Sequence, residues 1–248
     1  MTRTFKLTLE YDGSGFRGWQ IQAQGERTVQ GEFEKVLAKV FKQKTPAIAS
    51  GRTDSGVHAL GQAVSFKAKT RMTPVQVQKA LNAYLPLDMA VLEAKAVGAN
   101  FHAQYSAKKK TYRYTVLNRD HRSAFWRQRA YFYPHRLNIA AMRQATKFLV
   151  GKHDFKSFQA HDPLRADRNT VRTVKGVSVA KQGDFIHIEV IANGFLYKMV
   201  RNMVGTLLAV GSGRIKPAYV QALLKGKDRS IAPETAPAHG LCLMSVQY

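Results

Sequence analysis

Apolar and polar residues alternate over the first few positions of the chain. The apolar positions are Phe5, Leu7, Leu9 and Tyr11. A period of two is that of a half-buried β-strand. After the polar DGSG segment the spacing becomes that of a helix with one apolar side. The apolar positions of this helix are Val29, Phe33, Val36, Leu37, Val40 and Phe41. The chain is therefore expected to begin with a strand and then a helix that ends near Thr45-Pro46.

The same two kinds of element continue along the chain. Short strands are predicted at 62–67 and 89–97, and a helix between them begins after Thr73, since Thr can cap a helix and the following Pro suits its first turn. A second series follows, with strands predicted at 110–118, 171–180 and 185–192 and helices at 138–150 and 196–210. Because the same kinds of element return, the sequence predicts an α+β fold of two α/β halves, residues 1–105 and residues 106–248.

The charge of the chain indicates that the protein binds a partner. Its 248 residues are 45% apolar, enough for a substantial core, yet 39 Lys and Arg face only 16 Asp and Glu, which gives a formal net charge of +23. Such an imbalance indicates a polyanionic partner. An anionic membrane would call for a basic amphipathic helix or a lipidation signal, and the sequence offers neither. Nucleic acid is therefore the expected partner.

Cysteine content and hydropathy bear on the expected compartment. Cys242 is the single cysteine, so an intrachain disulfide and a Cys-rich zinc site are excluded. The first residues alternate instead of forming the apolar segment of a signal peptide. The most apolar tract, 191–210, is interrupted by Asn193, Lys198, Arg201 and Asn202. We expect a cytoplasmic protein that does not associate with membranes.

Basic and aromatic residues are concentrated between residues 101 and 136. This stretch holds nine Lys or Arg, nine aromatic residues and one acid. Cations reach phosphates while aromatic rings stack on exposed bases, a combination that suits single-stranded or looped RNA. The alternative is a charged surface that lies over aromatic residues of the core. Both interpretations are open for Tyr112 and Tyr114, which share one face of a predicted strand. Their rings stack on a base if that face is open, and they belong to the core if it is covered.

One carboxylate, Asp54, stands alone within GRTDSGVHA at residues 51–59. The nearest acids in sequence are Glu34 and Asp88, so no neighbouring residue forms a carboxylate pair with it. On the local sequence alone, an ordinary turn or helix cap is the favoured explanation of Asp-Ser-Gly. The same tripeptide resembles the aspartic protease signature, but Arg52 and Thr53 precede it in place of apolar residues, and no second copy occurs. A protease would therefore require a homodimer, and we disfavour that reading.

Arg201 flanks the apolar side of the predicted helix at 196–210. An Arg in this position either extends to solvent or pairs with a buried anion. In the second case Asp54 is the candidate anion, because a neighbouring Arg favours the ionised form of a carboxylate and fixes its orientation.

Six motifs together give the chain a close resemblance to one family, the tRNA pseudouridine synthase A family. They are YDGSGFRGWQ at 11–20, GRTDSGVHA at 51–59, FHAQYSAKKKTYRY at 101–114, DFKSF at 154–158, NGFLYKMVRNMVG at 193–205 and APAHGLCL at 236–243. They span nearly the whole chain in the order of the family. The departures from the family pattern are mild, such as Ser55, where the family often has Ala.

This resemblance implies an isomerase that converts uridine to pseudouridine at positions 38 to 40 of the tRNA anticodon stem-loop, without cofactor or metal. It also implies a pseudouridine synthase fold of two ferredoxin-like or RRM-like halves, whose antiparallel sheets flank a basic cleft, and a homodimer. By residue-to-residue match, Asp54 is the catalytic carboxylate and Arg52 fills the space left by a flipped uridine. Tyr112 packs on the target base, and Arg201 is the basic partner of Asp54.

Two alternatives remain beside the family function. A non-catalytic protein that binds structured RNA explains the charge, although it leaves the RTD motif and Arg201 without a purpose. A sister pseudouridine synthase with a different RNA substrate shares the chemistry. His58 and Cys242 receive no catalytic role, and His58 is interpreted as a structural hydrogen-bonding residue.

Overall fold

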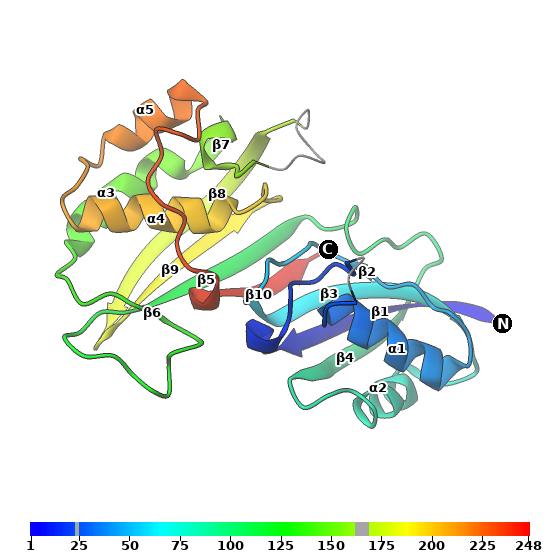
Figure 1. Ribbon diagram of the computed structural model, residues 1–248. Coiled ribbons are helices and arrows are strands. Elements are labelled where there is room, and N and C mark those ends of the chain that lie inside the picture. The colour runs from blue at the N-terminus through cyan, green and yellow to red at the C-terminus, as the bar shows by residue number, and fades with distance from the viewer. Residues whose placement is uncertain (23–24, 162–168) are drawn as a thin grey trace. The chain divides into compact units, whose positions relative to one another are not determined.

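The computed structural model describes residues 1–22, 25–161 and 169–248, which form two compact units (Figure 1). The first unit contains Met1–Lys108 together with Cys242–Tyr248, and the second contains Lys109–Leu241. The α+β class expected from the sequence is confirmed. The sequence-based division assigned residues 106–248 to the second half, whereas the last strand lies in the first unit.

The first unit is a sheet with two helices. Its elements are β1 (Thr2–Tyr11), α1 (Val29–Phe41), β2 (Ile48–Ala49), β3 (His58–Lys69), α2 (Pro74–Asn82), β4 (Met89–Val97) and β10 (Leu241–Gln247), with a 3₁₀ turn at Gly13–Gly15. The sheet order is β4-β1-β3-β10, and β2 pairs with β3. Since α2 connects β3 to β4 on either side of β1, and both pair antiparallel with β1, this is the split β-α-β arrangement of ferredoxin-like folds.

The apolar residues that alternate along β1 form part of the core of this unit, as the sequence predicts. Phe5, Leu7 and Leu9 have no exposed surface, and the Phe5 ring lies 5.5 Å from that of Phe66 on β3. Phe66 also contacts Phe33 and Phe41 of α1, so one aromatic cluster joins the helix to the sheet.

The cap expected at the start of the second helix is present. The Thr73 side chain accepts from the backbone of Gln76 while the Gln76 side chain accepts from the backbone of Thr73, a complete capping box.

The second unit has a sheet with three helices. Its elements are β5 (Lys109–Leu117), β6 (Tyr131–Phe132), α3 (Ile139–Leu149), β7 (Gly151–Asp154), β8 (Val171–Gln182), β9 (Phe185–Ala192), α4 (Met199–Gly211) and α5 (Tyr219–Gly226), with 3₁₀ turns at Lys156–Phe158 and Ala238–Gly240. The order β5-β9-β8-β7 again contains a split β-α-β unit, because α3 connects β5 to β8 on either side of β9. Helix α3 packs against both β8 and α4 (Figure 1).

Some details differ from the sequence predictions. Helix α1 ends at Phe41 and not near Thr45-Pro46, because Lys42 adopts a left-handed conformation (φ 54°). The helix predicted from Leu196 begins at Met199, because Lys198 adopts a left-handed conformation (φ 56°) that interrupts the helix before it. The sheets were expected to be antiparallel, yet β3 and β10 are parallel, as are β5 and β6. Each parallel pairing joins only two pairs of residues. The sequence predicts no strand for β10 or for β6.

Gly205 allows the segment before β10 to lie directly on α4. A Cβ atom at this position would stand 1.9 Å from the backbone oxygen of Glu234. A hydrogen bond also joins this segment to α4, since the Ala236 amide donates to the Arg201 carbonyl (3.2 Å). No L side chain fits here without moving the backbone.

We predict that Gly205→Ala lowers the free energy of unfolding by about 2–3 kcal/mol, because over-packing against backbone outweighs the gain in helix propensity of up to about 1 kcal/mol. Urea denaturation measures the difference. Gly176→Ala is the control, since no described atom lies within 4 Å of its would-be Cβ. A Gly205→Ala variant more stable than the parent would contradict this packing.

Candidate active site

Asp54 lies in the loop between β2 and β3, and hydrogen bonds fix the residues around it. The Thr53 carbonyl accepts from the Trp19 amide (3.0 Å), and its hydroxyl shares a 2.8 Å hydrogen bond with that of Tyr11. The Val57 amide donates to the Asp54 carbonyl (3.1 Å), which closes a turn. Asp54 itself is half-buried and Arg52 is exposed. The carboxylate is therefore held on a constrained backbone at the edge of solvent.

Two glycines of a second loop make this constraint possible. A Cβ on Gly13 would stand 2.1 Å from the Val57 carbonyl oxygen, and one on Gly18 would stand 2.8 Å from that of Thr53. Gly18 also has a φ of 85°, a left-handed conformation that favours glycine. The motifs YDGSGFRGWQ and GRTDSGVHA are more than thirty residues apart in the sequence, and in the fold they form two loops in direct contact.

His58 has a structural position in this pair of loops. Its buried ring places Nδ1 3.0 Å from the Gly13 amide nitrogen and 3.2 Å from Oδ1 of Asp12. Asp12 in turn accepts from the amide and hydroxyl of Ser14. Cys242 of β10 pairs in register with His58. These contacts connect the start of β3 to the glycine turn.

The aromatic face of β5 is covered. Tyr114 has no exposed surface, its hydroxyl donates to the Pro237 carbonyl (2.8 Å), and burial together with nearby Tyr131 raises its pKa, against a smaller opposite effect of Arg201. Tyr112 is 7% exposed and meets the Phe195 ring edge-on at 5.1 Å. Tyr114 is therefore a core residue, and base stacking by Tyr112 stays a prediction.

Arg201 is the one residue of the fully described helix α4 that is not buried. Its Nε donates to the Ala236 carbonyl (2.8 Å), and its own carbonyl accepts from the Ala236 amide. The segment after Ala236 continues across β5, where a Cβ on Gly240 would stand 2.5 Å from the Tyr114 ring. The strand, the helix and the APAHG motif thus orient Arg201 together.

Asn202, beside Arg201, is a buried polar residue to which the sequence analysis gave no role. It is completely buried, its Nδ2 donates to the Phe158 carbonyl (2.7 Å), and its Oδ1 accepts from the Thr235 hydroxyl (2.6 Å). It connects the DFKSF motif to the segment that holds Arg201. A polar residue within a predicted buried helix is the sequence signal for such a role.

Lys110 is a second residue to which the sequence analysis gave no role. Burial, with a further contribution from the positive charge of Arg172, lowers its pKa to about 8. Its place two residues before Tyr112 on β5 is the sequence signal, because residues i and i+2 share a strand face.

The four site residues expected from the sequence fall in different units. Asp54 and Arg52 belong to the first unit, and Tyr112 and Arg201 belong to the second. The partnership of Asp54 with Arg201 stays a prediction.

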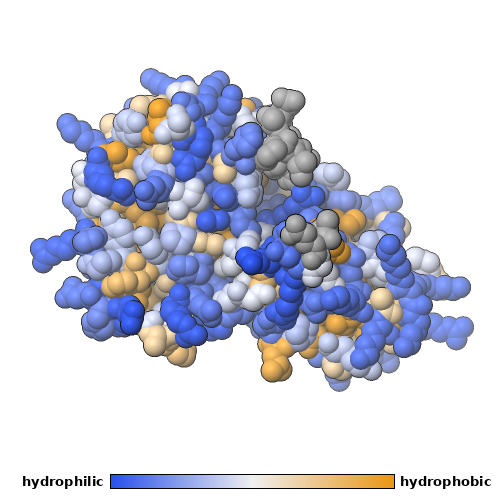
Figure 2. Space-filling view, viewed as in Figure 1, coloured by the Kyte–Doolittle hydropathy of each residue, from blue (hydrophilic) through white to orange (hydrophobic). Residues whose placement is uncertain are grey.

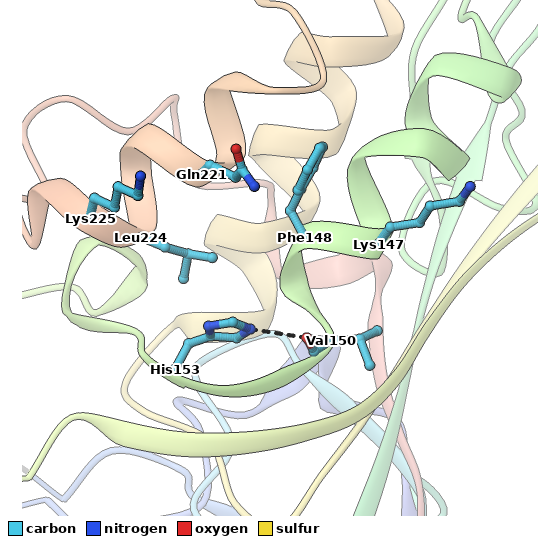
Figure 3. Close-up of a pocket in the computed structure, with 7 residues that line it drawn as sticks. All are labelled: Lys147, Phe148, Val150, His153, Gln221, Leu224 and Lys225. Atoms are coloured by element: carbon cyan, nitrogen blue, oxygen red, sulfur yellow. Dashed lines mark hydrogen bonds between the residues drawn. The ribbon is translucent and has the colours of Figure 1, made fainter.

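A cavity of about 310 Å³ lies elsewhere in the second unit, among α3, β7 and α5 (Figure 3). Phe148 and Leu224 supply its apolar lining, and His153, whose Nε2 bonds to the Val150 carbonyl (3.0 Å), closes one side. None of the described residues that line it is an expected site residue.

Across residues 1–22, 25–161 and 169–248 there is no group of three or more His, Cys, Asp or Glu side chains placed to hold a metal ion. Within the same residues, every helix is too short or too polar to cross a membrane. Hydrophilic residues cover most of the face shown in Figure 2.

Comparison with known proteins gives the class to which these motifs belong. A family model described as tRNA pseudouridine synthase matches residues 8–106 and 145–248. The tRNA pseudouridine synthase A of Moorella thermoacetica is 44% identical over 98% of both chains, and that of Bacillus subtilis is 45% identical over the same shares. The protein of that name from Geobacillus kaustophilus is 45% identical over 100% of this chain and 95% of its own.

The chain therefore belongs to the tRNA pseudouridine synthase family, as the six motifs indicated. Among solved structures, the crystal structure of a Cbf5-Nop10-Gar1 complex matches 83% of this chain and 54% of the solved chain, with a TM-score of 0.34 and 13% identity. That similarity is too low to support an argument.

We predict that the difference in unfolding free energy between the parent and Lys110→Met changes with pH. Unfolded Lys110 titrates near 10.5 and the folded residue near 8, so between these values the unfolded state binds more protons. The parent therefore gains stability relative to the variant as the pH rises from 8 to 10.5, by an amount on the order of 1–3 kcal/mol. Urea denaturation at pH 7.5 and 10 measures it.

Lys175→Met, which removes an exposed lysine of β8, is the control. A parent-to-variant difference for Lys110→Met that stays constant across this pH range would contradict the burial of the ammonium group.

Proposed function

We propose that this protein isomerises uridine to pseudouridine at positions 38 to 40 of the tRNA anticodon stem-loop. The observation that carries the proposal is the Asp54 loop, which the Gly13 and Gly18 contacts hold in one conformation, in a chain that matches tRNA pseudouridine synthases over nearly its full length. Such a constrained carboxylate is what covalent or acid-base catalysis requires.

The reaction moves one bond of the substrate. The bond between N1 of uracil and C1′ of ribose breaks, the uracil turns, and C5 joins C1′. The proton on C5 leaves to solvent, and N1 gains a proton. Substrate and product therefore have the same composition, and the reaction consumes no co-reactant. Asp54 starts it by attacking C6 of the base, by attacking C1′, or by removing a ribose proton, and these three routes remain open.

Charge explains why a lone acid suits this chemistry. A second carboxylate nearby would favour protonation of the first, whereas a guanidinium favours the charged form. In our proposal Arg201 is that partner, and its Nε–Ala236 hydrogen bond fixes the plane of the guanidinium.

The target base has to leave the helical stack of the RNA. This costs a few kcal/mol, which contacts to phosphates and stacking can offset. Tyr112 packs on the extruded uracil, and the exposed Arg52 occupies the space it leaves. The net charge of +23 supplies phosphate contacts, so binding weakens steeply with salt.

We also propose that the halves of the protein flank a basic cleft for the RNA, that the protein is a cytoplasmic homodimer, and that no cofactor or metal takes part. These statements rest on the family resemblance. A non-catalytic binder of structured RNA is the second candidate, since the charge alone favours it equally, and a synthase for another RNA is the third.

We predict that Asp54→Asn abolishes release of tritium to water from tRNA labelled at uridine C5, whereas the parent protein releases it. Asparagine keeps the shape of the loop residue but removes the charge that reacts, so tRNA affinity stays within about tenfold of the parent. Asp228→Asn, which changes an exposed carboxylate in the second unit, is the control and retains release.

Equal release by the parent and by Asp54→Asn would exclude Asp54 as the catalytic residue. Tight tRNA binding without any release by the parent would establish the non-catalytic candidate instead. A parent that is inactive on tRNA but releases label from another RNA in a panel of transcripts would establish the third candidate.

We further predict that recognition follows the shape of the anticodon arm. One site acts on three neighbouring uridines, so contacts to particular base edges would hinder two of the three substrates. A transcript whose stem sequence is scrambled with pairing preserved should therefore keep kcat/KM within about tenfold, while disruption of the pairing should abolish activity. Loss of activity on scrambling alone would show direct reading of bases.

A further inference from the structure

The connection between β5 and β6 exposes an aromatic residue among arginines. Phe125 is 77% exposed and the adjacent Trp126 is 37% exposed. Arg122 and Arg127 are also exposed. We call these four residues the 122–127 surface. They lie in the green loop that follows β5 in Figure 1, within the second unit.

Contacts with strand β9 hold this surface in place. The Trp126 ring meets the Phe185 ring of β9 edge-on at 5.1 Å, and the Phe125 ring meets the Trp126 ring edge-on at 5.5 Å. The Trp126 amide donates to the Ser123 hydroxyl, and the Trp126 carbonyl accepts from the amide of Ala130. A chain of aromatic contacts thus runs from the sheet to an exposed ring.

Hydrogen bonds to the turn before β9 and to the residues after β6 hold the start of the loop. The Asn118 amide donates to the Asp184 carbonyl (2.7 Å), and its side-chain nitrogen donates to the carbonyls of Tyr133 and His135 (2.8 Å each). Arg119 bonds to Asp184 at 3.2 Å. Because the loop is held in place, Phe125 is presented at small entropic cost to a ligand.

A single exposed apolar side chain needs no explanation, and Leu87 is a fully exposed example in this chain. The 122–127 surface differs because an ordered aromatic pair and two exposed guanidinium groups occur together. Aromatic faces and arginine are the groups that bind unpaired nucleotides, by stacking and by phosphate contact.

A second copy of the chain is the competing occupant. A two-fold contact through this surface would bring Arg122 and Arg127 of one copy against those of the other, and like charges at an interface oppose association. The charge therefore favours a polyanion over a copy of the same chain.

We propose that the 122–127 surface binds an unpaired nucleotide of the RNA substrate, with the base stacked on Phe125 and the adjoining phosphate on Arg122. This proposal rests on the function proposed above and adds a contact outside the catalytic residues. The surface follows the end of β5, and Tyr112 lies five residues earlier on that strand. At about 3.3 Å per residue this is roughly 17 Å along the strand, so the contacted nucleotide differs from the isomerised one.

The first experiment measures tRNA affinity by filter binding, with the full-length protein. Phe125→Leu keeps an apolar side chain but removes the π face, so Kd should rise by about 5- to 100-fold, the loss of one stacked base. Phe125→Trp restores stacking and should bind like the parent. Leu87→Ala, an exposed apolar change in the first unit, is the control and should leave Kd unchanged.

Salt dependence separates the two kinds of contact. Arg122→Gln should reduce the slope of log K against log salt by about one, because one phosphate contact is lost, and Phe125→Leu should leave the slope unchanged. An unchanged slope for Arg122→Gln would overturn the phosphate contact.

The position of the nucleotide follows from a panel of tRNA transcripts in which each unpaired nucleotide is made abasic in turn. At the stacked position, removal of the base and Phe125→Leu should be non-additive, since both delete the same contact. Additive effects at every position, or equal Kd for Phe125→Leu and parent, would overturn the proposal.

Light scattering on the parent and Phe125→Leu tests the competing occupant. If Phe125→Leu converts a dimer to a monomer, the surface is a self-interface and the proposal is wrong. Because these readouts are affinities, they are independent of turnover. Phe125-dependent binding without tritium release would refute the proposed function and leave the nucleotide site standing.

Discussion

The close backbone contact between the loop at 12–19 and the loop at 53–57 is the constraint from which the candidate active site follows. It requires glycine at positions 13 and 18, since a side chain at either would meet a carbonyl oxygen of the facing loop. Once the loops are in contact, the Trp19 amide and the Tyr11 hydroxyl fix Thr53, and the turn at Val57 fixes the other side of Asp54. The backbone of Asp54 is therefore positioned by the contact between the two loops.

A comparable constraint organises the second unit. The segment at 234–240 passes over α4 and then over β5, and Gly205 and Gly240 give it the room to do so. Arg201 bonds to this segment on one side, and the buried Asn202 bonds to it on the other. Because the segment leads directly into β10, the strand that pairs with β3 of the first unit, the last motif of the chain serves structure in both units.

The residues that suit RNA binding and the residues proposed for the chemistry are different sets. Most of the basic excess lies in exposed positions suited to a polyanion, while the proposed chemistry needs one carboxylate with a guanidinium partner. The 122–127 surface extends the same division, since it combines stacking and charge at a site built on β9 and away from Asp54 in sequence. A substrate held by many phosphate and stacking contacts can be positioned accurately without a large reactive centre.

The sequence by itself determined the class of fold, the strands and helices with clear periodicity, the Thr73 cap and the candidate residues Asp54, Arg52, Tyr112 and Arg201, because local patterns and motifs report on local structure. Only the tertiary structure decided that Tyr114 belongs to the core, that Asn202 is a buried junction, and that burial lowers the pKa of Lys110, since burial depends on what covers a residue. It also decided that β10 returns to the first unit, because a pairing between residues nearly two hundred positions apart leaves no period in the sequence. Gly61 permits that pairing, since a Cβ atom there would stand 2.4 Å from the Met244 carbonyl oxygen, a requirement that becomes visible only when both strands are in place.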